Sequence, residues 1–448
     1  MLGWRILSHG QYKLDLPPIT KEEAELITCA EERFREATRL RAVYDREESR
    51  KLVQGIVERA ADDSGVFLDR SQREYMGRVA FMHIYGVAFM EPILEDPEVE
   101  EISVVGPRKP VYVYLRKKGW RSVNACFDDE RTIADMVNRM ARPLGRHITM
   151  QNPRLDAVLP DGSRLHASLV PVSCGEITVR KFRERPFSPR ELVEAGTVSA
   201  GGMALLSVLM QCDFSVIVAG NTASGKTTTM NSLFSFVPAT ERIIIAEETP
   251  EINVPHGQRL RLVANRELGV SLRDLVYDSL RMRPDRMIVG EVRNREECEA
   301  LFDVLLAGQA RGSYATFHAQ SADEALSRLQ SFGARKEDLS SIDCIIVQRR
   351  MLEYDAARRS AREVRGVVEM AEVVRGEAEP FYRGGKLAKP PGLLERAAGS
   401  FGLGKNEMAR ELERRRKLIM RAGPAFGEFF REVQAEFFGA GPGGGGEE

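Results

Sequence analysis

Hydrophobic and polar positions change their spacing along this chain, and these changes divide it into segments. From residue 20 to residue 90, apolar residues such as Leu26, Ala30 and Phe34 recur every three or four positions between charged ones. That spacing places the apolar side chains on one face of a helix. We therefore expect a helical N-terminal module over residues 1–92.

Between residues 93 and 186 the pattern changes to short runs rich in β-branched and aromatic residues. Residues 101–105, 111–115 and 176–180 are runs of this kind, and Gly-Pro and Asp-Gly pairs separate such segments. These pairs favour turns, and the runs are typical of short strands. The segment 93–186 is therefore expected to be a small α+β domain.

A third pattern occupies residues 187–355, where short apolar strands alternate with helical segments. The strands are expected at residues 214–219, 242–246, 286–289, 313–317 and 344–347. Such alternation predicts a mostly parallel sheet covered by helices, which is an α/β fold. Beyond it we expect a charged helical region over 356–438 and a disordered Gly-rich tail over 439–448.

The composition excludes several classes of protein. Of 448 residues, 43% are hydrophobic and 29% are charged, and 65 Lys and Arg balance 66 Asp and Glu. The chain therefore has no net positive charge that would recruit nucleic acid. The apolar runs are shorter than the roughly 18 residues of a membrane helix, and the chain does not start like a secretory signal, so we expect a cytoplasmic protein. The six cysteines form no CxxC pair, which argues against a zinc site.

One short motif carries recognisable chemistry. Residues 220–227, Gly-Asn-Thr-Ala-Ser-Gly-Lys-Thr, fit the pattern GxxxxGK[ST] and stand between a predicted strand and a helical run. The glycines let the backbone curl around an anion, and the helix start offers unpaired N–H groups. Lys226 adds positive charge for the β and γ phosphates, and the Thr227 hydroxyl can ligate Mg²⁺. We predict that ATP and Mg²⁺ are cofactors and that the nucleotide contacts Gly220, Asn221, Thr222, Ala223, Ser224, Gly225, Lys226, Thr227 and Thr228.

Acidic residues follow two other predicted strands, and a histidine follows a third. Glu247 and Glu248 end one of these strands, and Glu291 ends the next. Carboxylates at such strand ends face the phosphates, where they can bind Mg²⁺ or order water, although a surface position would leave them merely solvated. His318 lies just past a further strand and is a candidate phosphate sensor or proton partner, but a lone histidine is more often structural.

Taken in order, these motifs resemble the type II/type IV secretion ATPase family, the hexameric motors of pilus assembly, archaellum assembly and protein or DNA secretion. The resemblance covers roughly residues 90–350 and includes the P-loop, an acidic box at 246–251, a Walker B variant at 283–293 and a histidine box that ends at His318. The Thr-Ala-Ser form of the P-loop at 222–224 looks like the archaeal branch.

The resemblance implies a fold and a set of site residues. The fold is a RecA-like P-loop ATPase domain preceded by a PAS-like α+β domain. In this family Glu291 would polarise the attacking water, and Glu247 would help to hold water and metal, so Thr227, Glu247 and Glu291 are the expected metal ligands. Arg164 and Arg180 look like arginines that complete the phosphate pocket. The expected catalytic set is Glu291, Glu247, His318, Arg164, Arg180 and Arg281.

One residue departs from the family pattern. Gln309 stands where the histidine box usually opens with a first histidine. Glutamine can form hydrogen bonds but cannot carry charge, so a role that needs an imidazolium at this position is in doubt.

The resemblance implies a homo-hexameric ATPase motor that works through a polytopic inner-membrane platform protein, and indirectly on pilin-like subunits, at the cytoplasmic face of the membrane. Two alternatives stay open. One is a nucleic-acid transfer motor of a conjugation type, although the balanced charge and the lack of an aromatic-basic stripe argue against direct nucleic-acid binding. The other is a nucleotide-gated scaffold without turnover. For the basic run at 414–417, we favour a solvated helix with an apolar packing face over a membrane-docking helix.

Overall fold

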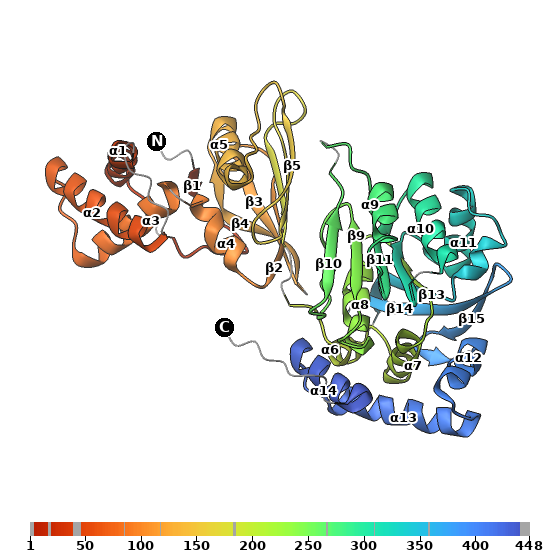
Figure 1. Cartoon of the computed structure of the whole chain (residues 1–448). Coiled ribbons are helices and arrows are strands. Elements are labelled where there is room, and N and C mark those ends of the chain that lie inside the picture. The colour runs from red at the N-terminus through yellow and green to blue at the C-terminus, as the bar shows by residue number, and fades with distance from the viewer. Residues whose placement is uncertain are drawn as a thin grey trace. The chain divides into compact units, whose positions relative to one another are not determined.

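The computed structural model divides the chain into two compact units, Met1–Phe182 and Arg183–Glu448 (Figure 1). The structure describes residues 4–16, 19–38, 46–84, 86–116, 118–181, 185–265, 268–308, 310–356 and 359–439. Gln309 and nearly all of the Gly-rich tail that was expected to be disordered lie outside the described residues.

The first unit contains amphipathic helices over residues 21–95, as the spacing of its apolar residues predicts. They are α1 (Lys21–Thr38), α2 (Arg46–Ser64), α3 (Arg70–Ile84), the 3₁₀ turn η1 (Ala88–Met90) and α4 (Glu91–Glu95). Helix α1 buries Leu26, Ile27, Ala30 and Phe34 along one face. The same hydrophobic core continues into the sheet of this unit, so the helices and the sheet stabilise each other.

That sheet is antiparallel and has the strand order β1-β4-β3-β2-β7-β6-β5. Its strands are β1 (Trp4–Ile6), β2 (Val99–Val104), β3 (Pro110–Leu115), β4 (Gly119–Phe127), β5 (Arg154–Val158), β6 (Arg164–Ser168) and β7 (Glu176–Arg180). Helix α5 (Glu130–Ala141) buries an apolar face in the shared core, and the 3₁₀ turn η2 (Arg142–Leu144) follows it.

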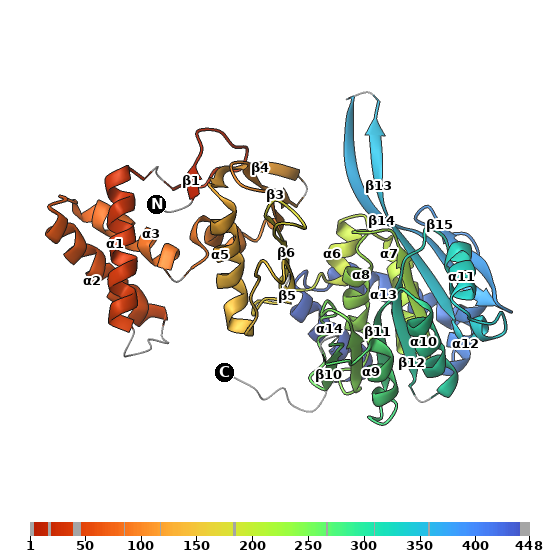
Figure 2. The same cartoon turned by 90° about the horizontal axis from the view of Figure 1, so that it is seen from above.

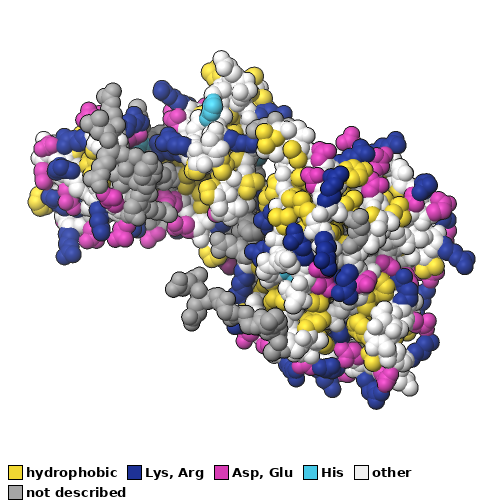
Figure 3. Space-filling view, in the orientation of Figure 1, with side chains coloured by type: hydrophobic (Ala, Val, Ile, Leu, Met, Phe, Trp, Pro, Cys, Tyr) yellow, Lys and Arg dark blue, Asp and Glu magenta, His cyan; other side chains and the backbone are white. Residues whose placement is uncertain are grey.

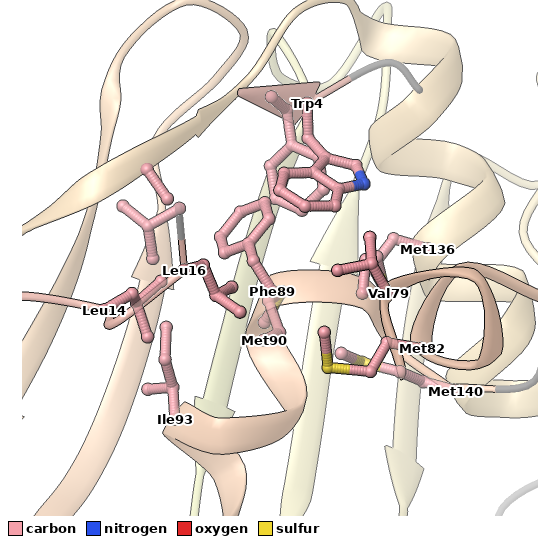
Figure 4. Packing of buried hydrophobic residues seen from close by; sticks show 14 of the residues in the cluster. Trp4, Leu14, Leu16, Val79, Met82, Phe89, Met90, Ile93, Met136 and Met140 are labelled. Atoms are coloured by element: carbon pink, nitrogen blue, oxygen red, sulfur yellow. The ribbon is translucent and has the colours of Figure 1, made fainter. Parts of the chain in front are cut away.

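The prediction of a helical N-terminal module over residues 1–92 was wrong at its start, where the chain forms strand β1. Strand β1 pairs with β4, with Trp4 opposite Phe127. The Trp4 ring packs against Phe89 (Figure 4). Phe89 in turn packs against Phe127. A three-residue strand is too short to show an alternation in the sequence, and only its partner strand, more than a hundred residues away, defines it.

The second unit is built on a sheet with the order β10-β9-β11-β12-β8-β13-β14-β15-β16. Pairing is parallel from β10 to β13 and antiparallel from β13 to β16. The strands are β8 (Val216–Gly220), β9 (Ile243–Glu247), β10 (Arg259–Val263), β11 (Arg286–Val292), β12 (Gly312–Phe317), β13 (Cys344–Asp355), β14 (Ser360–Val374), β15 (Glu377–Arg383) and β16 (Lys386–Leu387).

Helices cover both faces of this sheet because successive strand residues point to opposite sides. Val216 and Val218 of β8 belong to one core, with α7, α8 and α12 to α14, whereas Ile217 and Ala219 belong to the other, with α9 to α11. The helices are α6 (Pro189–Glu194), α7 (Ala200–Gln211), α8 (Lys226–Leu233), α9 (Leu272–Ser279), α10 (Arg295–Ala307), α11 (Ala322–Ser331), α12 (Gly392–Phe401), α13 (Lys405–Arg421) and α14 (Phe426–Phe438), with 3₁₀ turns η3 (Phe234–Phe236) and η4 (Asp338–Ser341).

The prediction of helix throughout residues 356–438 was wrong for its first part, because β14, β15 and β16 occupy residues 360–387. Strands β13 and β14 form a long hairpin that projects from the sheet (Figure 2). On the projecting part, arginines pair with glutamates across the strands, as in Arg362 with Glu353 and Arg350 with Glu363. Charged cross-strand pairs suit a solvent-exposed hairpin, but in the sequence they hide the alternation that marks a strand.

The basic run at 414–417 lies on α13, a helix with exposed charged residues and a buried apolar face as predicted, but one of its arginines is buried. Arg415 is 3% exposed and donates hydrogen bonds to the Ser207 hydroxyl and the Gln211 side chain of α7. Glu436 and Glu413 neutralise its neighbours Arg414 and Arg416. Helix α14 adds an apolar packing face through Phe426, Phe429 and Val433. Within the described part of the chain, no helix combines the length and the apolar character needed to cross a membrane.

Candidate functional site

The GxxxxGK[ST] motif forms the loop between β8 and α8. Ala223 and Gly225 adopt left-handed backbone conformations, with φ of 59° and 97°. Gly225 is the N-cap of α8 and provides no capping side chain, as an anion-binding helix start requires. A Cβ at Gly220 would lie 2.1 Å from the Gln348 carbonyl oxygen, so this position tolerates only glycine. The loop therefore has the shape of a phosphate cradle.

The loop is tied to β13 by side chains. Asn221 accepts a hydrogen bond from the backbone N–H of Arg350 (2.9 Å) and donates one to its carbonyl (3.1 Å). The Thr229 hydroxyl donates to Gln348 Oε1 (2.6 Å), and the residue Gln348 is 2% exposed. Of the remaining predicted loop contacts, Thr222 is exposed, Thr228 is half-buried in the first turn of α8, and Ser224 is fully buried.

Lys226, Glu291 and His318 come together beside this loop from three different elements. Lys226 Nζ donates to the carbonyls of Gly220 (3.2 Å) and Asn221 (3.4 Å) and lies 3.9 Å from Glu291 Oε1. His318 Nε2 lies 2.8 Å from the same Glu291 oxygen, and His318 Nδ1 lies 3.5 Å from Lys226 Nζ. Burial and the Lys226 charge lower the pKa of His318 against the opposing effect of Glu291, which favours a neutral imidazole.

A bulge in β11 helps to direct Glu291. Between Val289 and Val292 this strand carries one residue more than its partner β12. A bulge of this kind turns a side chain away from the regular alternation, and bulges recur beside active sites. The Thr316 hydroxyl donates to the Gly290 carbonyl (2.5 Å), which fixes the backbone just before Glu291.

The Thr227 hydroxyl, expected to be a metal ligand, donates to Glu251 Oε2 (2.9 Å). Sequence reasoning did not single out Glu251, although it closes the acidic box at 246–251. Its position in that motif was the signal that could have identified it. The pair consists of hard oxygen donors, which are the ligand type that Mg²⁺ takes alongside phosphate oxygens and water.

Glu247 has a different environment from the one expected. It is 1% exposed, and its Oε1 accepts hydrogen bonds from the backbone N–H groups of Glu251 (2.7 Å) and Ile252 (2.8 Å). Its Oε2 lies 3.3 Å from Arg261 Nε, and burial raises its pKa to about 7. These contacts make Glu247 an anchor for the loop that carries Glu251. Among the described residues, three or more His, Cys, Asp or Glu side chains do not converge on a metal position.

The predicted arginines fall into two groups. Arg164 and Arg180 lie directly opposite each other on β6 and β7 of the first unit, and Arg180 is also opposite Glu101 of β2. The structure thus brings these arginines together in one row of that sheet. Arg281 lies beyond the end of α9, is 83% exposed and pairs with Asp278 at 3.8 Å. Its described ion pair does not connect it to Lys226, Glu291 or His318.

Arg293, at the end of the Walker B variant, contacts both Glu291 and Glu248. The sequence motif includes this arginine, but the sequence analysis assigned it no role. Its position two residues after Glu291, just beyond the end of β11, was the available signal.

A family model described as "Type II/IV secretion system protein" matches residues 87–386. An uncharacterised protein of Methanocaldococcus jannaschii is 34% identical over 275 residues, which cover 60% of this chain and 49% of that protein. The chain thus spans about half the length of that relative. A putative conjugal transfer protein of Mycobacterium tuberculosis is 31% identical over 271 residues, which cover 57% of this chain and 76% of that protein. Among solved structures, the X-ray structure of the Legionella pneumophila ATPase DotB aligns with a TM-score of 0.46 and 16% identity, covering 78% of this chain and 90% of that one.

Proposed function

Since the chain belongs to the type II/IV secretion system protein family, we propose that it is a motor ATPase that powers assembly of a pilus-like or archaellum-like filament, or secretion, through a membrane platform protein. The observation that carries the proposal is the convergence of Lys226, Glu291 and His318 on the phosphate cradle. A cation for phosphate, a carboxylate for water and a polar partner for that carboxylate are the groups that ATP hydrolysis needs.

Each group has a distinct task in this proposal. The N–H groups of the loop and of the first turn of α8 bind the phosphates, and Lys226 exchanges its long contacts with backbone carbonyls for phosphate oxygens. Glu291 orients the attacking water and accepts its proton, while His318 holds the carboxylate. Thr227, with Glu251 beside it, fits a Mg²⁺ ion, which would neutralise charge on the phosphates.

The arginines and the assembly complete the proposal. Arg164 and Arg180, which lie directly opposite each other on β6 and β7, supply guanidinium groups to the nucleotide in this proposal, since guanidinium is permanently charged and forked for phosphate oxygens. A homo-hexamer with ATP and Mg²⁺ as cofactors, acting on a membrane platform protein, follows from the family resemblance. Arg281 stays in the proposed catalytic set only through the family resemblance, and its side chain is 83% exposed.

The test compares phosphate release by the wild type and by Glu291→Gln, which keeps the size of the side chain and removes the carboxylate. We expect Mg²⁺-dependent turnover in the wild type and a loss of about 100-fold or more in the variant, with ATP binding retained. Glu299→Gln is the matched control, because Glu299 pairs with Arg295 on the surface of α10. A wild type that binds ATP without turnover would favour a nucleotide-gated scaffold and contradict the proposal.

A nucleic-acid transfer motor is the second candidate, favoured by the match to the putative conjugal transfer protein. Over much of the face drawn in Figure 3, however, basic side chains are interspersed with acidic ones. Binding of the full chain to single-stranded DNA at several salt concentrations separates the two functions. A transfer motor that tracks DNA would bind it with a steep salt dependence, whereas the filament motor would not bind it at all.

A further inference from the structure

Arg293 contacts two carboxylates from different parts of the site. Its Nε and Nη2 lie 2.6 and 2.5 Å from Glu291 Oε2, and its Nη1 lies 2.7 Å from Glu248 Oε2. The planar guanidinium therefore uses one edge for Glu291 and another nitrogen for Glu248. Two nitrogens meet a single oxygen of Glu291 while the third donates to Glu248, and a lysine, which has one nitrogen, would not bridge the two carboxylates in this way.

The two oxygens of Glu291 consequently have separate partners. Oε1 faces His318 at 2.8 Å and Lys226 at 3.9 Å, whereas Oε2 faces Arg293 alone among its described ion pairs. Once Lys226 turns to phosphate, its long contact no longer orients the carboxylate. His318 and Arg293 then hold it from opposite sides, and the rotation of the carboxylate depends on both.

The backbone that carries Arg293 is itself held in place. The Arg293 N–H donates to Glu297 Oε2 (2.6 Å), and the Asn294 side chain caps the first turn of α10 through the Glu297 N–H. Glu297 is 6% exposed, so this anchor is buried. An exposed ion pair between mobile side chains contributes little to orientation or stability. The Arg293 side chain is 46% exposed, but the backbone of Arg293 is anchored and its guanidinium contacts two carboxylates.

We propose that Arg293 is a positioning residue that holds the Glu291 carboxylate in its hydrolytic orientation and links it, through Glu248, to the acidic box. The inference rests on the proposed function, since it assigns Arg293 a role in the same hydrolysis. Arg293 touches neither phosphate nor water in this role and acts through Glu291.

The test compares steady-state kinetics of the wild type, Arg293→Gln and Arg293→Lys. A small displacement of a catalytic group can cost up to about 100-fold in rate, so we expect kcat to fall about 10–100-fold in Arg293→Gln, with KM and ATP affinity within about threefold of the wild type. Arg293→Lys retains the charge but cannot span both carboxylates, and it should restore only part of the rate. Glu248→Gln replaces the charged acceptor of the second contact with a neutral one and should cost less than Arg293→Gln.

Controls separate positioning from folding and from the proposed function. Arg295→Gln breaks an exposed arginine–glutamate pair on α10 and should leave kcat unchanged. Combining Arg293→Gln with Glu291→Gln should lower kcat no further than Glu291→Gln does alone, because both act through one carboxylate. An active wild type with an unaffected Arg293→Gln variant overturns this inference alone, whereas a wild type without turnover contradicts the proposed function. In that case a crystal structure of Arg293→Gln decides the inference, which an unmoved Glu291 carboxylate would overturn.

Discussion

The two ends of strand β11 both carry charged side chains. The charged group at one end is fully buried with short hydrogen bonds, whereas the one at the other end is partly exposed with a long ionic contact. At the N-terminal end Arg286 is fully buried, with Nε 2.5 Å from Glu241 Oε2 and Nη1 donating to the Cys212 carbonyl (2.8 Å) and the Tyr314 hydroxyl (3.0 Å). At the C-terminal end Glu291 is 20% exposed, and its contact with Lys226 spans 3.9 Å.

The difference indicates which cluster serves stability and which serves chemistry. A buried guanidinium is tolerated only when short hydrogen bonds satisfy it, and Arg286 meets that condition. Lys226 instead has long contacts that a phosphate can replace. At one end of β11, Arg286 has all its partners within the protein, and we call this the saturated end. At the other end, the Lys226–Glu291 contact is long and a ligand can replace it, and we call this the exchangeable end. Charge and burial alone therefore do not identify the candidate nucleotide site.

The largest expected effect is on stability at the saturated end. Arg286→Met leaves the Glu241 carboxylate, which is 6% exposed, with only the half-exposed Arg311 as a described ionic partner. Removing one partner of a buried pair costs about 3–5 kcal/mol of unfolding free energy. Denaturant unfolding measures it, and Arg311→Gln, which removes the outer contact, should cost less than about 1 kcal/mol. Equal losses in both variants would contradict the comparison.

A smaller effect concerns pH and the buried His256. Its ring packs against Phe234 and Phe430, and burial lowers its pKa to about 4. The folded protein therefore favours the neutral ring, and this contribution to stability is complete above about pH 6.5 and is lost as the pH falls toward about 4. The difference between the pKa of His256 in the folded and the unfolded protein corresponds to about 3 kcal/mol of unfolding free energy.

Glu247 titrates in the opposite sense, because its raised pKa of about 7 makes the folded protein bind a proton more tightly than the unfolded chain. The contribution of Glu247 to stability is present at low pH and is lost as the pH rises toward about 7, so the effects of His256 and Glu247 partly cancel.

The measurement for His256 is the difference in unfolding free energy between the wild type and His256→Leu from pH 7 to pH 4. A constant difference over this range would contradict the assignment.

The smallest effect on stability is expected at the exchangeable end. Lys226→Met should change the unfolding free energy without nucleotide by less than about 1 kcal/mol, because His318 and Arg293 still hold Glu291. The same change should abolish the rise in melting temperature that saturating ATP produces in the wild type. Thermal unfolding with and without ATP measures both. A large loss of stability without nucleotide would place Lys226 with the structural ion pairs instead.

The positions of the phosphate loop, of Glu291 and of His318 follow from local patterns, and the structure brings Lys226 of this loop close to both side chains. Other features were missed for identifiable reasons. The short strand β1 has no periodicity of its own, and the charged β13–β14 hairpin shows none of the alternation of a half-buried strand. The basic run at 414–417 gave no sign that Arg415 is buried against α7.

The amino-acid sequence by itself determined five strands of the second unit, β8, β9, β11, β12 and β13, together with the phosphate loop and the family, because each depends on residues close together in the chain. Only the tertiary structure decided that Glu247 anchors a loop, that Glu251 stands beside Thr227, and that Arg293 joins two carboxylates. Those roles depend on which of several neighbouring acidic side chains turns inward. Gly290 leaves room for the inward-turned Glu247, since a Cβ at this position would lie 2.9 Å from the Glu247 Cγ.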